Sequence, residues 1–143
     1  MDTNKKSTKM DMKLKFSILW IFLMFNYLYC DLLTGMESEV LKGYLKGKVD
    51  SIQINQGFLL GAAILMEIPT AMVLLSWVLK YRINRWANII AGSIMAVVQL
   101  STLFMGTPTL HYLFYSTIEI ACTLFIAWNA WKWKPDFEPN TGG

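Results

Sequence analysis

The chain has 143 residues, of which 55% are hydrophobic and only 16% are charged, and its formal net charge is +3. A mean hydropathy of +0.38 leaves too little polar surface for a water-soluble domain, and the length allows one domain. The basic residues lie at the ends of apolar runs, so we expect them to flank a membrane and we expect no nucleic-acid partner.

Residues 1–15 are polar and rich in lysine, and they lack apolar periodicity, so we predict a disordered basic tail. An apolar stretch follows at about 16–33. It is long enough for a first membrane span, since a spanning helix needs about 20 mostly apolar residues. No small-residue cleavage site follows this stretch, so we interpret it as a retained helix rather than a secretory signal.

The segment between residues 34 and 56 is the one sizeable loop that we expect. Within it, residues 38–47 (SEVLKGYLKG) place apolar side chains at helical spacing. This pattern predicts a short amphipathic helix that lies on the membrane surface. An irregular loop remains the alternative for so short a segment.

Three further spans are predicted at about 57–79, 87–105 and 110–131, and residues 134–143 are predicted to be a second disordered tail. Small residues spaced four apart let helices approach closely. Such spacing occurs at Gly57 and Gly61 and again at Gly92 and Ala96, and these positions offer a route to a homo-oligomer. The predicted fold class is therefore all-α, an integral membrane four-helix transmembrane bundle with a short amphipathic outer-loop helix.

The distribution of Lys and Arg predicts the orientation. Ten of these residues fall on the side that holds both termini, and three, namely Lys42, Lys46 and Lys48, fall on the other side. The positive-inside rule then places the N-terminus and the C-terminus in the cytoplasm, in a multi-pass protein of the inner (plasma) membrane.

Several polar residues lie within the predicted spans. Glu67 in the second span and Glu119 in the fourth lie about 20 and 15 Å from the outer surface, at a rise of 1.5 Å per residue. On the fourth helix, His111 and Tyr115 precede Glu119 at intervals of four residues, so the three share one face. Ionisable residues at this depth are costly and mark functional sites by default.

Two neighbouring buried glutamates would not both ionise, and no Lys or Arg lies inside any predicted span to pair with them. At neutral pH we therefore expect at least one to be protonated, or a cation to lie between them. The candidate ligand-binding residues are Glu67, Glu119, Gln99, Asn26, Tyr115 and His111.

The sequence holds one His, two separated Cys and no phosphate-binding or nucleophile motif, so it predicts neither a metal site nor a catalytic residue and identifies no cofactor. The leading hypothesis is binding or transport of a small ligand, a cation or a proton at the carboxylate pair. The alternative is a structural or interaction subunit of a membrane complex without its own ligand. A weaker alternative is a membrane enzyme that uses the carboxylates as acid and base.

Four stretches, ILWIFLMFNYLYCDLL, QGFLLGAAILMEIPTAMVLLS, RWANIIAG and GTPTLHYLFYSTIEIACTLF, resemble a family of small four-helix bacterial membrane proteins of unknown function. The resemblance covers about Leu14 to Trp133, and the general layout is also similar to DoxX-like proteins. It implies a four-span membrane fold and brings no assigned activity.

Overall fold

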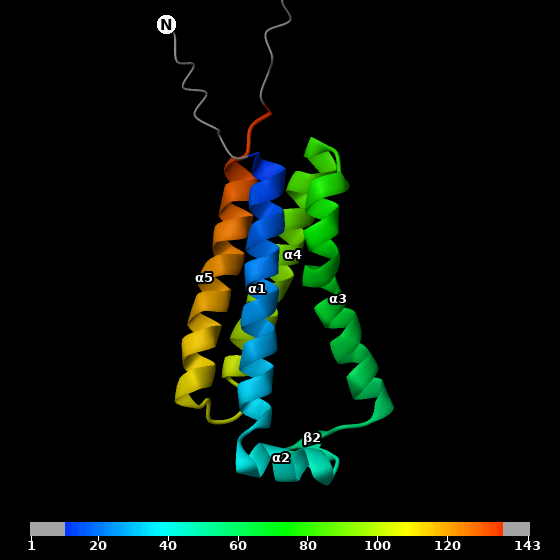
Figure 1. The fold of residues 1–143 in the computed structure, drawn as a ribbon, viewed down its shortest axis with the longest axis vertical. Coiled ribbons are helices and arrows are strands. Elements are labelled where there is room, and N and C mark those ends of the chain that lie inside the picture. The colour runs from blue at the N-terminus through cyan, green and yellow to red at the C-terminus, as the bar shows by residue number, and fades with distance from the viewer. Residues whose placement is uncertain (1–10, 136–143) are drawn as a thin grey trace, which may run out of the picture.

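A computed structural model describes residues 11–135, and their fold is all-α apart from one small hairpin (Figure 1). Four long helices form the bundle, and each is long and apolar enough to cross a membrane. They are α1 (Met12–Gly35), α3 (Gln56–Val78), α4 (Tyr81–Leu103) and α5 (Leu110–Lys132). The predicted four-helix bundle is confirmed.

The connection between α1 and α3 closes one end of the bundle, which we call the α2 end. It contains α2 (Ser38–Leu45), which lies across this end as the predicted short amphipathic helix (Figure 1). A two-stranded antiparallel hairpin follows, formed by β1 (Lys48–Val49) and β2 (Ile52–Gln53). The sequence analysis missed this hairpin because two-residue strands produce no periodic signal. The opposite end, where α1 begins and α5 ends, is called the terminal end.

Two helices begin earlier than the apolar runs indicate. The side chain of Asp11 accepts a hydrogen bond from the Lys13 amide at 3.1 Å, so α1 starts at Met12, inside the predicted tail. Helix α4 starts at Tyr81 rather than at the predicted 87. Hydropathy detects only the apolar part of a helix, whereas backbone hydrogen bonding continues into the basic flanks. The predicted disorder of residues 1–10 and 136–143 lies outside the described residues.

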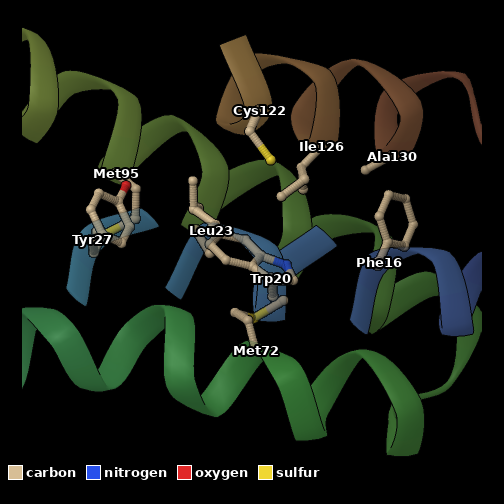
Figure 2. Packing of buried hydrophobic residues seen from close by; sticks show 10 residues of the cluster. Phe16, Trp20, Leu23, Tyr27, Met72, Met95, Cys122, Ile126 and Ala130 are labelled. Atoms are coloured by element: carbon tan, nitrogen blue, oxygen red, sulfur yellow. The ribbon is translucent and has the colours of Figure 1, made fainter. Parts of the chain in front are cut away.

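Helix α1 supplies the centre of the apolar core (Figure 2). Its buried side chains recur every three or four residues, which directs them to one face. In a bilayer, helices associate through close packing and interhelical hydrogen bonds rather than through the hydrophobic effect. The core contains Phe16, Trp20, Leu23 and Tyr27 of α1, Met72 of α3, Met95 of α4, and Cys122, Ile126 and Ala130 of α5.

A buried hydrogen-bonded network joins α1, α3 and α4 in the terminal half of the bundle. Trp20 Nε1 donates to Asn88 Oδ1 at 2.8 Å, and Asn88 Nδ2 donates to Asn84 Oδ1 at 2.7 Å. Asn84 Nδ2 in turn donates to the Ser76 carbonyl at 2.6 Å. All four side chains are completely buried, so these bonds satisfy groups that no solvent could reach. We interpret the network as structural.

The two pairs of small residues have different surroundings. An added Cβ at Gly92 would lie 3.0 Å from the Thr123 carbonyl oxygen, and Ala96 is also buried, so α4 packs closely on α5 within one chain. In contrast, every residue from 56 to 64 of α3 is exposed, and an added Cβ at Gly61 meets nothing within 4 Å. This part of α3 diverges from α1 (Figure 1), and the buried residues of α3 begin only at Pro69.

Candidate functional site

Glu119 is the buried carboxyl group at the centre of the candidate site. It lies nine residues from the start of α5 at Leu110, or about 14 Å along the helix, and is only 1% exposed. Neither carboxylate oxygen has a hydrogen-bond partner within residues 11–135. The Tyr27 hydroxyl on α1 is also buried without such a partner in this range, and it interacts electrostatically with Glu119.

An unsatisfied buried carboxyl group is expensive. Leaving a buried polar group without a hydrogen bond costs about 1–3 kcal/mol, and the cost is larger for a charged group. Glu119 and Tyr27 therefore form the strongest candidate for a binding site.

Further polar groups lie between Glu119 and the α2 end. Asp31 on α1 interacts electrostatically with Glu119, as do Cys30 on α1 and Tyr112 on α5. We call Tyr27, Cys30, Asp31, Tyr112 and Glu119 the polar track. Tyr27, Cys30 and Glu119 are buried, Tyr112 is half-buried, and Asp31 is exposed.

His111 forms a polar cluster at the outer limit of this track. His111 Nε2 lies 3.3 Å from Thr34 Oγ1 and 3.4 Å from Glu37 Oε1, which joins the start of α5 to the end of α1. Tyr44 of α2 packs close to Gly35 at the same end. Partial burial, and then the Asp31 carboxylate, raise the pKa of Tyr44, so its hydroxyl stays protonated at neutral pH.

Gln99 lies close to the site but bonds to a different residue. Its Nε2 donates to Ser116 Oγ at 2.7 Å, and Ser116 precedes Glu119 by three residues on α5. Asn26 is buried, yet its amide donates to the Phe22 carbonyl of its own helix at 2.8 Å. Tyr115 is half-buried and places its ring edge against Phe114. No hydrogen bond within residues 11–135 connects these three predicted residues to Glu119.

The two predicted glutamates have opposite environments. Glu67 lies on α3 and is exposed, whereas Glu119 is buried beside α1. The charged side chain that interacts with Glu119 is Asp31 rather than Glu67. The carboxylate pair therefore stays a prediction, and the site is built on Glu119.

The predicted site residues omitted four residues of the polar track, namely Tyr27, Cys30, Asp31 and Tyr112. Tyr27 belongs to the apolar stripe of α1 and resembles any core aromatic residue, and Asp31 is a single carboxylate near the end of the first apolar stretch. One signal was available. Tyr27 and Asp31 are four residues apart and therefore share a face of the first helix.

The chemistry of the polar track is that of carboxyl, phenol and thiol groups. Within the described range, no group of three or more His, Cys, Asp and Glu could hold a metal ion. A carboxyl group beside a phenol can take up and release a proton, or bind a singly charged cation while ionised.

Comparison with known proteins gives one match. A protein-family model described as a family of unknown function (DUF6326) matches residues 6–138. No curated protein and no solved structure matches the chain. The expected resemblance to a membrane-protein family of unknown function is confirmed, and none of these comparisons links the chain to DoxX-like proteins.

Proposed function

Because this chain belongs to DUF6326, a family without an assigned function, we propose from its geometry that it binds a proton or a small cation at Glu119. The observation that carries this proposal is the burial of both Glu119 oxygens without a hydrogen-bond partner in the described residues. The four apolar helices make the chain a membrane protein, and the site lies at the middle of one of them.

The two states of the carboxyl group explain why a positive ligand fits. An isolated carboxylate is strongly disfavoured in an apolar medium, so the group is neutralised by a proton or compensated by a cation. The Tyr27 hydroxyl can donate to the ionised carboxylate and accept from the protonated form. Neither group has a hydrogen-bond partner among the described residues, so a movement that brings the two together would satisfy both of them in either protonation state.

Access to the site is proposed from the α2 end. The polar track and the His111 cluster lead from Glu119 toward that end. Toward the terminal end, the seam between α1 and α5 is filled by buried apolar side chains, including Leu23, Ile126 and Ala130 (Figure 2). Glu119 itself is 1% exposed, so a ligand can enter only if the α2 end of the track opens, and transport also requires this apolar segment to open.

We also propose the membrane and the orientation. Three basic residues belong to the α2 end and ten to the opposite side, which supports a bacterial inner membrane with both termini in the cytoplasm. The polar track then opens to the outside of the cell.

Infrared titration of the purified protein in lipid tests the proposal. We expect a carboxyl band that disappears on ionisation, is lost in Glu119→Gln and is retained in Glu67→Gln. The amide keeps the shape of the side chain, and exposed Glu67 provides a control for a membrane glutamate on another helix. If the titrating band is unchanged in Glu119→Gln, the proposed site is wrong.

A flux assay then distinguishes binding from transport. Proteoliposomes that contain a trapped pH indicator are given a pH step, and the internal pH is followed. If the protein transports protons, the wild type and Glu67→Gln should dissipate the pH gradient, whereas Glu119→Gln should not. Equal dissipation by all three proteins would contradict a Glu119-dependent transport step.

The exposed α3 segment supports a second candidate function, that of an interaction subunit. Residues 56–64 make no buried contact within the chain, and they include Gly57 and Gly61. A second copy packed against these positions would form the predicted homo-oligomer. Gly92 and Ala96 already pack inside the chain, so the interface is assigned to α3 alone.

A further inference from the structure

A surface pocket of about 510 Å³ lies at the terminal end, away from Glu119. Tyr81 and Arg85 of α4 form one wall, and residues 131–135 at the end of α5 form the other. Three of the lining residues are basic, namely Arg85, Lys132 and Lys134, and none of the lining residues within 11–135 is acidic.

Arg85 is held in a fixed position. Its Nε donates to the Ala130 carbonyl at 3.1 Å and its Nη2 to the Trp131 carbonyl at 2.8 Å. These are among the last carbonyls of α5, which have no partner inside the helix, so Arg85 caps the helix. A guanidinium carries five donors, and the hydrogen bonds found within residues 11–135 leave its Nη1 free.

The electrostatic balance of the pocket favours an anion. The carboxyl end of α5 carries a partial negative charge, equivalent to about half an elementary charge. Arg85 compensates this charge through its two bonds. Among the described residues, the exposed Lys134 and Lys132 then add positive charge, with Lys132 Nζ lying 4.3 Å from the centre of the Trp128 ring. Phosphate oxygens suit the free donors because they accept several charge-assisted hydrogen bonds.

Aromatic residues give the pocket a rigid wall at the membrane boundary. Trp133 packs edge-on against Tyr81 at 4.8 Å and Phe16 at 5.5 Å, and the Tyr81 hydroxyl donates to the Trp133 carbonyl at 2.6 Å. Trp131 is 62% exposed beside it. Tryptophan is enriched where a helix leaves the hydrocarbon, at the depth of the lipid headgroups.

We propose that this pocket binds the phosphate of an anionic phospholipid headgroup. Arg85 would provide the fixed donor, while Lys132 and Lys134 would reach the phosphate from the rim. Basic pockets between membrane helices bind such headgroups, and each Lys or Arg near the surface strengthens the attraction. The site is independent of Glu119.

The test measures lipid binding to the full-length protein in neutral detergent by native mass spectrometry. We expect phosphatidylglycerol to bind more tightly than phosphatidylcholine. Arg85 also caps α5, so the informative variant is the double substitution Lys132→Gln/Lys134→Gln. It should weaken phosphatidylglycerol binding about fivefold per lysine, or about 25-fold in total.

The control variant is Lys46→Gln/Lys48→Gln, which removes the same charge at the α2 end and should leave binding unchanged. Equal binding of the two lipids by the wild type would overturn the proposal, as would an equal loss in both double variants. Glycerol 3-phosphate supplies the same phosphate without the acyl chains. If it binds as tightly as phosphatidylglycerol, the lipid assignment is wrong and the pocket serves a soluble anion.

Discussion

Glu119 and Glu67 show how two residues of one type can differ in a membrane protein. Both follow apolar runs in the sequence, yet Glu119 is 1% exposed and Glu67 is exposed. The difference arises because α5 packs against α1 along the Glu119 face, whereas the α2-end half of α3 diverges from the bundle. Depth along a helix can be counted from sequence, but the direction that a side chain faces depends on its neighbours.

The polar network at Asn88 should be essential for stability. Asn88→Leu removes the acceptor for Trp20 Nε1 and the donor to Asn84 Oδ1, and it leaves these two buried atoms without a bond, while Asn84 Nδ2 keeps its bond to the Ser76 carbonyl. We expect the free energy of unfolding to fall by about 2–4 kcal/mol, because each stranded buried group costs about 1–3 kcal/mol. Denaturant unfolding of the protein in mixed micelles measures this loss, and a change below about 0.5 kcal/mol would contradict it.

The substitution Tyr27→Phe tests the candidate site, where we expect little change in stability. The hydroxyl forms no hydrogen bond within residues 11–135, so its removal should change the free energy of unfolding by less than about 0.5 kcal/mol. The infrared carboxyl band of Glu119 should nevertheless shift, because the other buried group without a hydrogen-bond partner is lost. A matched Tyr112→Phe variant, on the same helix as Glu119, should shift the band less. An unmoved band in Tyr27→Phe would remove Tyr27 from the site.

At the scale of the elements, α1 and α5 form the site and α3 contributes little to it. Helix α1 supplies Tyr27, Cys30 and Asp31, and α5 supplies Glu119 and Tyr112. Pro69 lies at the boundary between the exposed and the buried parts of α3. An interior proline removes one helix hydrogen bond and permits a bend, which is consistent with the divergence of this helix.

The two glycine positions give a direct comparison of packing. Gly92→Leu places side-chain atoms against the Thr123 carbonyl, which belongs to backbone and cannot move cheaply, so we expect a loss of about 1–3 kcal/mol. Gly61→Leu meets open space and should leave the stability of the monomer unchanged. Thermal unfolding in detergent checks both. Equal destabilisation by the two substitutions would show that Gly61 also contacts a neighbour.

The same Gly61→Leu variant tests the interaction function. If residues 56–64 form a homo-oligomer, chemical cross-linking in the membrane should give dimers in the wild type and fewer in this variant. Gly92 is already buried within one chain, so Gly92→Ala is a poor oligomer probe and serves as a negative control. Absence of cross-linked wild-type protein would leave α3 facing lipid.

The sequence predicts the fold more completely than it predicts the candidate site. Four apolar runs separated by short polar connections determine four spanning helices, because a bilayer admits few other backbone arrangements. The pairing of Glu67 with Glu119 depends on interhelical contacts, and Pro69 permits a bend in α3 without determining its direction. Gln99 was correctly placed inside the bundle, but its bond to Ser116 could not be inferred from spacing along one helix.

At the scale of the whole molecule, the two ends have different chemistry. The α2 end carries the polar track with its carboxyl groups and the His111 cluster. The terminal end carries a basic pocket with exposed tryptophan beside it. A cation and an anionic lipid would therefore bind at opposite ends of one bundle, and each proposed ligand matches the local charge.

This polarity leads to a prediction about topology. Positively charged loops are retained in the cytoplasm, and among the described residues the terminal end carries seven Lys and Arg against three at the α2 end. We therefore expect a C-terminal reporter that is active only in the cytoplasm to be active, and a reporter that requires export to be silent.

A cysteine introduced at exposed Ser51, in the β1–β2 turn, should react with an impermeant maleimide from outside intact cells. A cysteine at exposed Arg82, near the start of α4, should react only after the cells are opened. The opposite labelling pattern would reverse the orientation, and Glu119 would then be reached from the cytoplasm, so the proposed ligand would be a cytoplasmic cation or proton.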